Sequence, residues 1–377
     1  MFPAVLTYDI RKNDFLRKEE FVLKKMSVCI LFGGISPEHE VSLRSAESVL
    51  NHIDHEKYNV FPVGITKEGD WILFGGQDYS MLPAGTWQSC ENNRRAAISP
   101  VHGQGLLSFE NDCVVRERID VVFPVLHGAN GEDGAIQGLL QIAGIPYVGP
   151  GIAASAACMD KCMTKLVADL AGVRQAKWIP LTKASYDHAP DSSVDAVEAA
   201  FQYPVFVKPA GTGSSVGVSK ARDRQELLQA LDTAFMFDKK ILVEEFIPGK
   251  EVECAILGNE TPVASICGEI DAGADFYDYE AKYLSDSSSL YIPARLDDNV
   301  SEEVRNSAVK IYEALGCSGL SRVDFFVMED GTVVFNEINT IPGFTSISMY
   351  PKLFEASGIP YSQLIDQLLE LAIQVRP

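Results

Sequence analysis

The chain has 377 residues, which is too many for one hydrophobic core, so two or three lobes are expected. Its composition is 46% hydrophobic and 22% charged, which is typical of a soluble globular protein and excludes disordered, collagen-like and coiled-coil chains. No apolar run approaches the length of a membrane span. Asp and Glu outnumber Lys and Arg by 52 to 32, for a net charge of −20, which disfavours nucleic acid and anionic membranes as partners.

The eight cysteines are scattered without a CxxC pair. We interpret them as reduced thiols that act as small apolar side chains, which predicts a cytoplasmic location. Residues 1–25 lack the apolar core and the cleavage site of a signal peptide, and a buried strand begins only after Met26. We therefore interpret residues 1–25 as a disordered or non-native extension.

The first part of the chain alternates strands and helices. Near-continuous runs of Val, Ile and Leu predict parallel strands that are covered on both faces, with helices between them. The expected strands are Val28–Phe32, Val60–Ile65 and Asp120–Leu126, and the expected helices are Val41–Ile53 and Ala135–Ala143. Such sheets bind ligands beyond the carboxyl ends of their strands, here at Gly33–Glu40 and His127–Gly134.

A break at Tyr147–Gly151 indicates a lobe boundary. Beyond it we expect a helix, a strand that enters a glycine-rich loop, a second helix and three antiparallel strands with short turns. These segments are, in order, Ala153–Ala171, Pro204–Pro209, Gly211–Ser219, Gln225–Phe237, Ile241–Phe246, Glu251–Leu257 and Val263–Ile270. The polar and aromatic segment Asp271–Leu290 is expected to be a lid or a binding loop.

A metal site is predicted from a hairpin near the C-terminus. Two apolar runs flank Asp330-Gly331, the dipeptide favoured in two-residue hairpin turns. Pairing outward from that turn sets Met328 opposite Val333 and Phe326 opposite Phe335. Asp324 then lies opposite Glu337, with Cβ atoms ~4.5–5.5 Å apart, and Asn339 points to the same face. Facing carboxylates repel each other unless a hard cation lies between them, so these oxygen ligands indicate Mg²⁺ or Mn²⁺.

Other interpretations of this hairpin stay open. The carboxylates could form an exposed acidic patch, or one of them could pair with Arg322. A three-residue turn would shift the register by one residue and break the Asp324–Glu337 pairing.

The glycine-rich loop predicts a cover over a phosphate, because it offers backbone amides and hydroxyl groups. It lacks the lysine and the following helix of a Walker loop, and it leads into a returning strand rather than the helix of a dinucleotide-binding loop. Lys208 ends an otherwise apolar strand beside this loop, which indicates a functional position. Lys161, considered alone, is typical of a surface charge.

Together these motifs resemble the D-alanine–D-alanine ligases of the ATP-grasp superfamily, from about Met26 to the C-terminus. The motifs that carry the resemblance are Glu38-His-Glu-Val-Ser42, His127-Gly-Ala-Asn-Gly-Glu-Asp-Gly134, Met159-Asp-Lys161, Phe206-Val-Lys-Pro-Ala210, Gly213-Ser-Ser-Val-Gly-Val-Ser219, Tyr277-Asp-Tyr-Glu-Ala-Lys-Tyr283, Arg322-Val-Asp324 and Asn336-Glu-Ile-Asn-Thr-Ile-Pro-Gly-Phe-Thr-Ser346. The resemblance implies two-step ligation for peptidoglycan synthesis. ATP phosphorylates the carboxylate of one D-alanine, and the amine of a second D-alanine displaces the phosphate.

The resemblance also implies an α/β ATP-grasp fold with three lobes. We place the N-terminal α/β lobe at 26–149, the central lobe with the glycine-rich loop at 150–243, and the C-terminal lobe with the lid 271–290 and the metal site at 244–377. A cytoplasmic homodimer formed through the first lobe is also implied.

On the nucleotide side, the resemblance implies two Mg²⁺ or Mn²⁺ ions held by Asp324, Glu337 and Asn339. It assigns Lys161, Lys208 and Lys282 to the phosphates of ATP, which replaces the surface interpretation of Lys161. The other implied ATP contacts are Ser214, Ser215, Glu244, Glu245, Ile247 and Glu251, of which Glu251 would bind the ribose.

On the amino-acid side, the resemblance implies that Glu40 holds the ammonium of the first substrate, with Ser214 and Tyr283 as hydrogen-bonded partners and Lys282 nearby. Arg322 and the backbone of Gly343 would stabilise the tetrahedral intermediate. Ser348 would contact the carboxylate of the second substrate. His127 either lies near the first substrate or is a structural loop residue.

Related ligases join D-alanine to D-serine or D-lactate, and the resemblance ties those activities to an arginine at the position that Met349 occupies here. Met349 is thus a predicted substrate contact, and its apolar side chain favours D-alanine. Two alternatives from other classes are a nucleotide-binding sensor without turnover, which would need a missing catalytic group, and a dinucleotide-dependent oxidoreductase, which the loop context disfavours.

Overall fold

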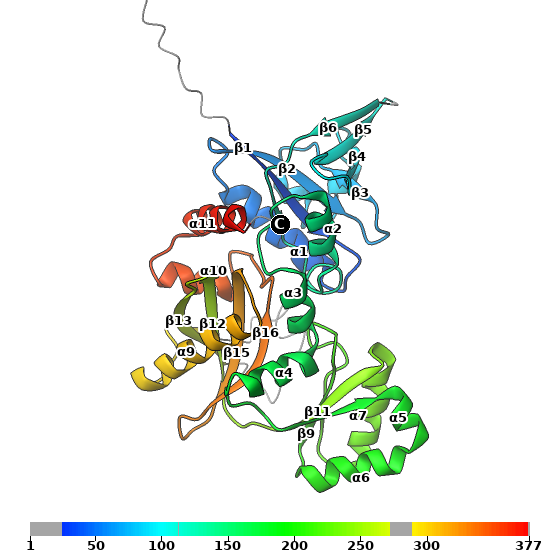
Figure 1. The fold of residues 1–377 in the computed structure, drawn as a ribbon, viewed down its shortest axis with the longest axis vertical. Coiled ribbons are helices and arrows are strands. Elements are labelled where there is room, and N and C mark those ends of the chain that lie inside the picture. Colours follow the sequence, from blue (N-terminus) through cyan, green and yellow to red (C-terminus); the bar gives the residue numbers. More distant parts are fainter. Residues whose placement is uncertain (1–24, 112, 272–288, 376–377) are drawn as a thin grey trace, which may run out of the picture.

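The computed structural model describes residues 25–111, 113–271 and 289–375, and three sheets form its framework (Figure 1). Lys282, Tyr283 and nearly all of the expected lid lie outside the described residues. Among the described residues, no helix combines the length and apolar character needed to cross a bilayer. The helices are α1 (His39–His52), α2 (Ala135–Ala143), α3 (Ile152–Met159), α4 (Lys161–Leu170), α5 (Lys183–His188), α6 (Pro190–Ala200), α7 (Arg224–Phe237), α9 (Asp298–Ala314), α10 (Met349–Ala356) and α11 (Tyr361–Gln374).

The first sheet has the strand order β6-β5-β4-β3-β2-β1-β7. Its strands are β1 (Met26–Gly33), β2 (Tyr58–Ile65), β3 (Trp71–Leu73), β4 (Arg94–Ile98), β5 (Leu106–Glu110), β6 (Cys113–Glu117) and β7 (Val121–Pro124). β1 runs parallel to β2 and β7, which confirms the predicted parallel core. The antiparallel strands β3 to β6 extend this core and were not anticipated.

Both faces of the first sheet are buried, as successive side chains of β1 show. Val28, Ile30 and Phe32 pack in one cluster with apolar residues of α1 and of the C-terminal helix α11. Cys29 and Leu31 pack on the other side, in a cluster that includes α2. Both faces are therefore covered, as predicted, although one covering helix comes from the far end of the chain.

The second sheet has the order β10-β9-β11-β8 and is antiparallel. Its strands are β8 (Trp178–Thr182), β9 (Val205–Pro209), β10 (Ser219–Ala221) and β11 (Lys240–Glu245). β9 and β10 flank the glycine-rich loop, so the predicted strand–loop–strand arrangement is confirmed, although β10 begins later than expected. β11 was expected to join the following two strands, but it pairs with β8 and β9 instead.

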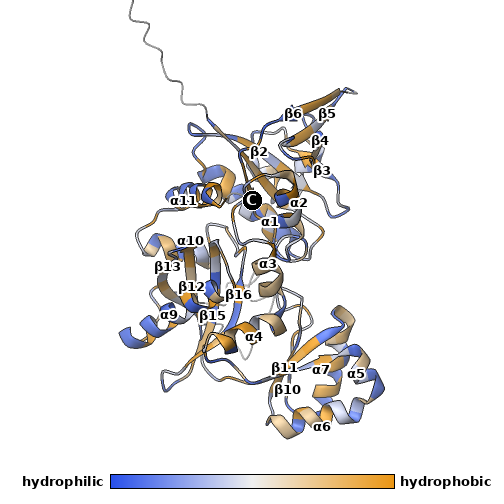
Figure 2. Cartoon of the chain, in the orientation of Figure 1, coloured by the Kyte–Doolittle hydropathy of each residue, from blue (hydrophilic) through white to orange (hydrophobic). Residues whose placement is uncertain are grey.

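The third sheet has the order β14-β13-β12-β15-β16. Its strands are β12 (Lys250–Gly258), β13 (Val263–Asp271), β14 (Ser289–Tyr291), β15 (Gly319–Val327) and β16 (Val333–Asn339). Helix α9 packs on it through Val304, Ala308, Ile311 and Tyr312. Figure 2 shows the mixture of blue and orange residues along α9 that such one-sided packing produces.

The helix expected over Ala153–Ala171 is divided into α3 and α4. Asp160 separates them with an extended backbone, and its carboxylate accepts hydrogen bonds from the Cys162 and Met163 amides at the start of α4. Both helices contribute to the hydrophobic cluster of the third sheet, through Ala154 and Ala168 among others. The segment also contacts the second sheet, because the Lys161 amide donates to the Ala210 carbonyl and Cys162 packs with Ala210 and Leu242. Its assignment to the central lobe stays a prediction.

All eight cysteines are free thiols. Six of them are buried, which confirms the prediction that they act as small apolar side chains. The sulfur atoms of Cys158 and Cys317 lie 3.7 Å apart.

Candidate active site

The β15–β16 hairpin sets two carboxylates side by side. Asp324 pairs directly with Glu337, as predicted, but the turn and the residue pairs between them differ from the prediction. The Met328 amide donates to the Thr332 carbonyl, so the turn holds three residues rather than two. A β-bulge next to Asp324 then leaves Asn336 without an opposite partner and restores the register.

Two of the predicted core pairs are therefore wrong. Because the three-residue turn shifts the register near the tip, Phe326 pairs with Val334 rather than with Phe335. Val333 pairs with Val327 rather than with Met328. The bulge is the feature that keeps the Asp324–Glu337 pairing intact despite this shift.

Asp324 is buried and strongly hydrogen-bonded. The Arg322 guanidinium donates to both of its carboxylate oxygens at 2.8 and 2.7 Å, and the Asn339 side-chain amide donates at 3.0 Å. Arg322 also lies 3.0 Å from the Glu253 carboxylate. The structure thus shows the Arg322 pairing that the sequence left open, and it excludes an exposed acidic patch at Asp324.

The three oxygen-bearing side chains can hold a hard divalent cation. Asp324 on β15 and Glu337 and Asn339 on β16 lie on neighbouring strands, with Asp324 in contact with Asn339 and paired with Glu337. The described residues contain no group of three or more His, Cys, Asp or Glu that could hold an ion. Two carboxylates and an amide instead fit Mg²⁺, which protein sites commonly bind through one or two carboxylates together with substrate phosphates.

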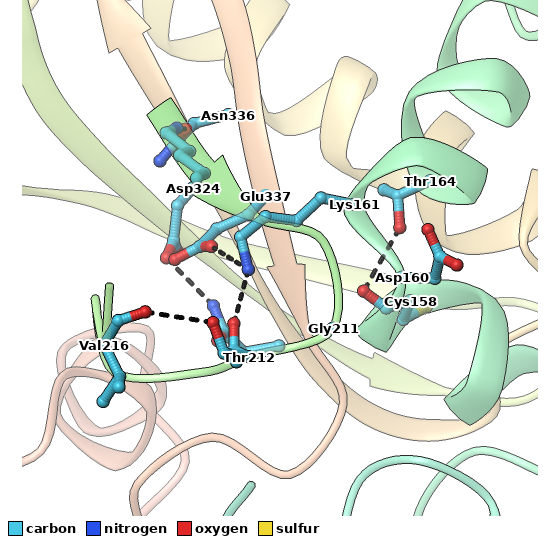
Figure 3. Close-up of polar contacts among 12 residues, drawn as sticks. Cys158, Asp160, Lys161, Thr164, Gly211, Thr212, Val216, Asp324, Asn336 and Glu337 are labelled. Atoms are coloured by element: carbon cyan, nitrogen blue, oxygen red, sulfur yellow. Dashed lines mark hydrogen bonds and ion pairs between the residues drawn. The ribbon is translucent and has the colours of Figure 1, made fainter. Parts of the chain in front are cut away.

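Two lysines from different elements approach this hairpin. Lys161 lies at the start of α4, and its ammonium donates to the Thr212 carbonyl at 2.8 Å and lies 3.8 Å from the Glu337 carboxylate. Figure 3 shows Lys161 between Glu337 and the loop at Thr212. Lys208 on β9 donates to the Asn336 side-chain oxygen at 3.2 Å. The site therefore combines acidic groups from β15 and β16 with basic groups from α4 and β9.

A buried ion-pair cluster lies at the base of the site. Glu244 is 2.7 Å from Lys208 and 2.9 Å from Lys165, which the sequence analysis did not single out. Burial alone would raise the pKa of Glu244, but the two ammonium groups hold it at about 2. Burial alone would lower the pKa of Lys208, but Glu244 keeps it above its usual value. Glu244 and Lys208 are therefore both charged at neutral pH.

A cavity of about 710 Å³ lies between the second and third sheets. Phe206, Phe246 and Phe326 contribute aromatic surface, and a volume of this size is typical of small-molecule sites. Predicted ATP contacts that line this cavity are Lys161, Lys208, Ser214, Ser215, Glu244, Glu245, Ile247 and Glu251. The side chain of Glu245 also accepts a hydrogen bond from the Lys177 amide, at 2.8 Å.

A second cavity, of about 50 Å³, adjoins the first. Lys161, Ser214 and Glu337 line both of them. Ser214 and Ser215 have left-handed backbone angles, with φ of 50° and 56°, which are uncommon for residues other than glycine. The buried Ser214 hydroxyl has no hydrogen-bond partner among the described residues. An unpaired buried hydroxyl at the junction of two cavities is suited to contact a ligand.

The structure separates two acidic residues near the start of α1. Glu40 is largely exposed and forms an ion pair with Lys67 at 2.5 Å, whose hydrogen bond holds the pKa of Glu40 below its usual value. Glu38 is buried and lines the small cavity. A Cβ atom on Gly213 would lie 3.0 Å from the Glu38 carboxylate, and one on Gly128 would lie 2.5 Å away. Glu38, rather than the predicted Glu40, therefore faces the glycine-rich loop.

The predicted residues near the second substrate lie outside both cavities. The Ser348 hydroxyl accepts from the Thr345 amide and contacts the Thr345 hydroxyl, next to Gly343. Met349 is buried against Gly268 on β13, in the hydrophobic cluster of α10 and α11. The Met349 side chain thus contributes to the core, where the sequence analysis had expected a substrate contact.

His127 is held inside the protein by both ring nitrogens. Nδ1 lies 2.9 Å from the Ile341 carbonyl and Nε2 lies 2.9 Å from the Ser45 hydroxyl. Burial lowers the pKa of His127, so the ring is neutral at pH 7. Because a carbonyl oxygen only accepts, Nδ1 carries the proton and Nε2 accepts from Ser45. This arrangement favours the structural alternative that the sequence left open.

Comparisons with known proteins extend over nearly the whole described chain. Residues 27–150 match the family described as the D-ala D-ala ligase N-terminus, and residues 167–370 match the D-ala D-ala ligase C-terminus. The chain belongs to the D-alanine–D-alanine ligase family. It is 51% identical to the D-alanine–D-alanine ligase of Caldicellulosiruptor bescii, with 93% of this chain and 96% of that protein covered. The corresponding ligase of Acetivibrio thermocellus is 50% identical, with the same coverage.

Solved structures of family members confirm the ATP-grasp fold. The VanG D-Ala:D-Ser ligase from Enterococcus faecalis matches with a TM-score of 0.84 and 40% identity, covering 93% of this chain and 100% of that one. The D-alanine–D-alanine ligase from Coxiella burnetii matches with a TM-score of 0.80 and 35% identity, covering 93% and 96%. The predicted family, fold class and enzyme class are thereby confirmed.

Proposed function

We propose that this chain joins two D-alanine molecules in an ATP-dependent reaction that proceeds through an acyl phosphate and supplies the dipeptide for peptidoglycan. The observation that carries the proposal is the wall shared by the two cavities, which contains Lys161, Ser214 and Glu337. A cavity large enough for ATP therefore adjoins a small polar one at a point rich in charged groups.

In this proposal the nucleotide occupies the larger cavity. Phe206 and Phe246 offer apolar faces for the adenine ring, and Glu251 lies on the same wall as a ribose contact. Lys161 and Lys208 direct positive charge at the phosphates, which offsets the repulsion between the γ-phosphate and the attacking carboxylate. Mg²⁺ or Mn²⁺, when held by Asp324, Glu337 and Asn339, would supply further neutralisation of the phosphates.

The first D-alanine is proposed to bind at the small cavity. Glu38 offers a buried carboxylate for its ammonium group, and the Ser214 hydroxyl offers a hydrogen bond beside it. Arg322, next to the paired carboxylates, is proposed to stabilise negative charge on the reacting carbonyl. The Gly343 backbone is proposed to stabilise the same charge, and Ser348 is proposed to contact the carboxylate of the second amino acid.

The choice of second substrate is a separate question, because the matching structures include a D-Ala:D-Ser ligase. We propose D-alanine as the second substrate. The experiment is to incubate the purified chain with ATP, Mg²⁺ and D-alanine, alone or with D-serine or D-lactate, and to identify the products by mass spectrometry. D-alanyl-D-alanine as the main product supports the proposal. A preference for D-serine or D-lactate, or ATP binding without any product, would refute it.

We also propose a cytoplasmic homodimer. Apolar residues that remain exposed on the first lobe support this assembly, since Phe109 and Val114 face each other on β5 and β6 and Ile142 lies at the end of α2. Light scattering coupled to gel filtration tests it, and a monomeric mass at micromolar concentration would contradict it.

A further inference from the structure

Lys165 is a buried cation that the proposed reaction does not use directly. It lies on α4 one turn beyond Lys161, and only 2% of its side chain is exposed. Its ammonium lies 2.9 Å from one carboxylate oxygen of Glu244. Burying a lysine is unfavourable unless its charge is compensated, so Glu244 is the group that permits this position.

Glu244 is shared between two lysines. Its other carboxylate oxygen lies 2.7 Å from the Lys208 ammonium, which also donates to Asn336. Two ammonium groups and one carboxylate give the cluster a net charge of +1. Without Lys165, Lys208 and Glu244 would form a neutral pair, and the positive field that Lys208 contributes to the large cavity would be largely cancelled.

We propose that Lys165 is a positioning residue for Lys208. Lys165 neutralises the charge of Glu244 from the side away from the large cavity, so that the charge of Lys208 remains available to the phosphates of the nucleotide. The inference rests on the proposed function, because it requires ATP in the large cavity. Lys165 touches neither cavity and acts only through Glu244. Its occupation of one carboxylate oxygen also leaves a single oxygen to Lys208, which fixes the direction in which Lys208 is held.

A purely structural role would have different consequences. Replacing a buried ion pair with apolar groups of similar volume is often neutral or stabilising, so stability alone does not require two lysines around one carboxylate. A structural Lys165 would change the stability of the fold and affect all ligands alike. A Lys165 that supplies net charge would affect the binding of ATP, which is anionic, and not that of adenosine, which is neutral.

The test compares Lys165→Met, which leaves the cluster neutral, with Lys165→Arg, which keeps the net charge of +1. A third variant, Lys165→Gln, also removes the charge but retains a hydrogen-bond donor toward Glu244. Lys239→Met, which removes an exposed lysine from the same lobe, is the matched control. For each protein we would measure thermal stability, KM for ATP and for D-alanine, and displacement of a fluorescent ATP analogue by ATP and by adenosine.

We expect Lys165→Met to weaken the binding of ATP at least about tenfold, which corresponds to about 1.4 kcal/mol. The KM for D-alanine and the affinity for adenosine should be nearly unchanged. Lys165→Arg should stay within about threefold of the wild-type affinity for ATP, because it keeps the charge. If Lys165→Met does not fold, Lys165→Gln takes its place and should show the same loss of ATP affinity.

Three results would overturn the inference: equal weakening of ATP and adenosine binding, parallel changes in KM for ATP and D-alanine, or a folded Lys165→Arg variant that binds ATP as weakly as Lys165→Met. Measurements on the wild-type protein distinguish a failure of this inference from a failure of the proposed function. Failure of the wild type to bind ATP would refute the proposed function. Normal wild-type turnover with an unchanged Lys165→Met variant would refute only the role of Lys165.

Discussion

The nucleotide side and the amino-acid side of the site are built from different kinds of structure. Lys208, Glu244, Asp324 and Glu337 lie on paired strands, whose register fixes each side chain relative to its neighbours. Glu38 and Ser214 lie at a helix start and on a loop, where no ladder sets their direction. The comparison shows that strand pairing fixes the relative positions of side chains that are far apart in the sequence. The positions of loop side chains instead depend on packing against other lobes.

The largest effect is expected on the nucleotide side, from Glu337→Gln. This change removes a charge from the proposed cation site without changing the side-chain volume, so phosphoryl transfer should fall at least about 100-fold while the fold is retained. ADP release and circular dichroism measure the two properties. Glu329→Gln, in the exposed turn of the same hairpin, is the control and should retain activity. Near-normal turnover of Glu337→Gln would contradict the proposed ligand role.

The amino-acid side is tested by replacing each of two neighbouring carboxylates, separately, with an amide. Glu38→Gln should raise KM for the first D-alanine about tenfold or more, because a buried charge-assisted hydrogen bond to an ammonium is lost. Glu40→Gln removes an exposed ion pair and should change that KM by less than about twofold. Initial rates at saturating ATP measure both effects. A larger effect from Glu40→Gln would restore the assignment made from the sequence.

A smaller effect is expected from Glu132, on the pH dependence of the free energy of unfolding. Glu132 accepts hydrogen bonds from the Gly128 and Ile341 amides, and burial raises its pKa to about 8. A raised folded-state pKa stabilises the fold fully below the unfolded value, and this contribution is lost as pH rises through about 8. Urea unfolding across that range should therefore show stability falling with pH, and Glu132→Gln should reduce the slope. An identical slope in both proteins would refute this.

The smallest effect is expected at Met349. Its burial against Gly268 predicts that Met349→Leu, a swap of similar volume, changes the free energy of unfolding by less than about 1.5 kcal/mol. The preference for D-alanine over D-serine should not change. A competition assay with both amino acids measures this preference, and a shift toward D-serine would return Met349 to the substrate site.

The sequence predicted most of what depends on local pattern. Apolar periodicity located β1, β2, β7, α1 and α2, and the hairpin pairing located Asp324 opposite Glu337. That last prediction succeeded because the bulge at Asn336 offset a turn longer than expected, and neither feature has a distinct signature in the sequence. The break at Asp160 did have one, since aspartate is a common N-cap.

Other parts of the site could not be predicted, because they depend on contacts between lobes. Lys165 follows Lys161 by one helical turn, but only the packing of α4 buries it next to Glu244. Glu38 and Glu40 are two residues apart in one motif, and nothing in their spacing shows which of them faces Gly213. The burial of Met349 likewise depends on the distant Gly268.

The central claim, that the hairpin holds a divalent cation with the nucleotide, is tested most directly by electron paramagnetic resonance of Mn²⁺. Wild-type protein with a non-hydrolysable ATP analogue should bind Mn²⁺ tightly and shift its spectrum, whereas Glu337→Gln with the same analogue should not. Equal Mn²⁺ binding by both proteins would contradict the account.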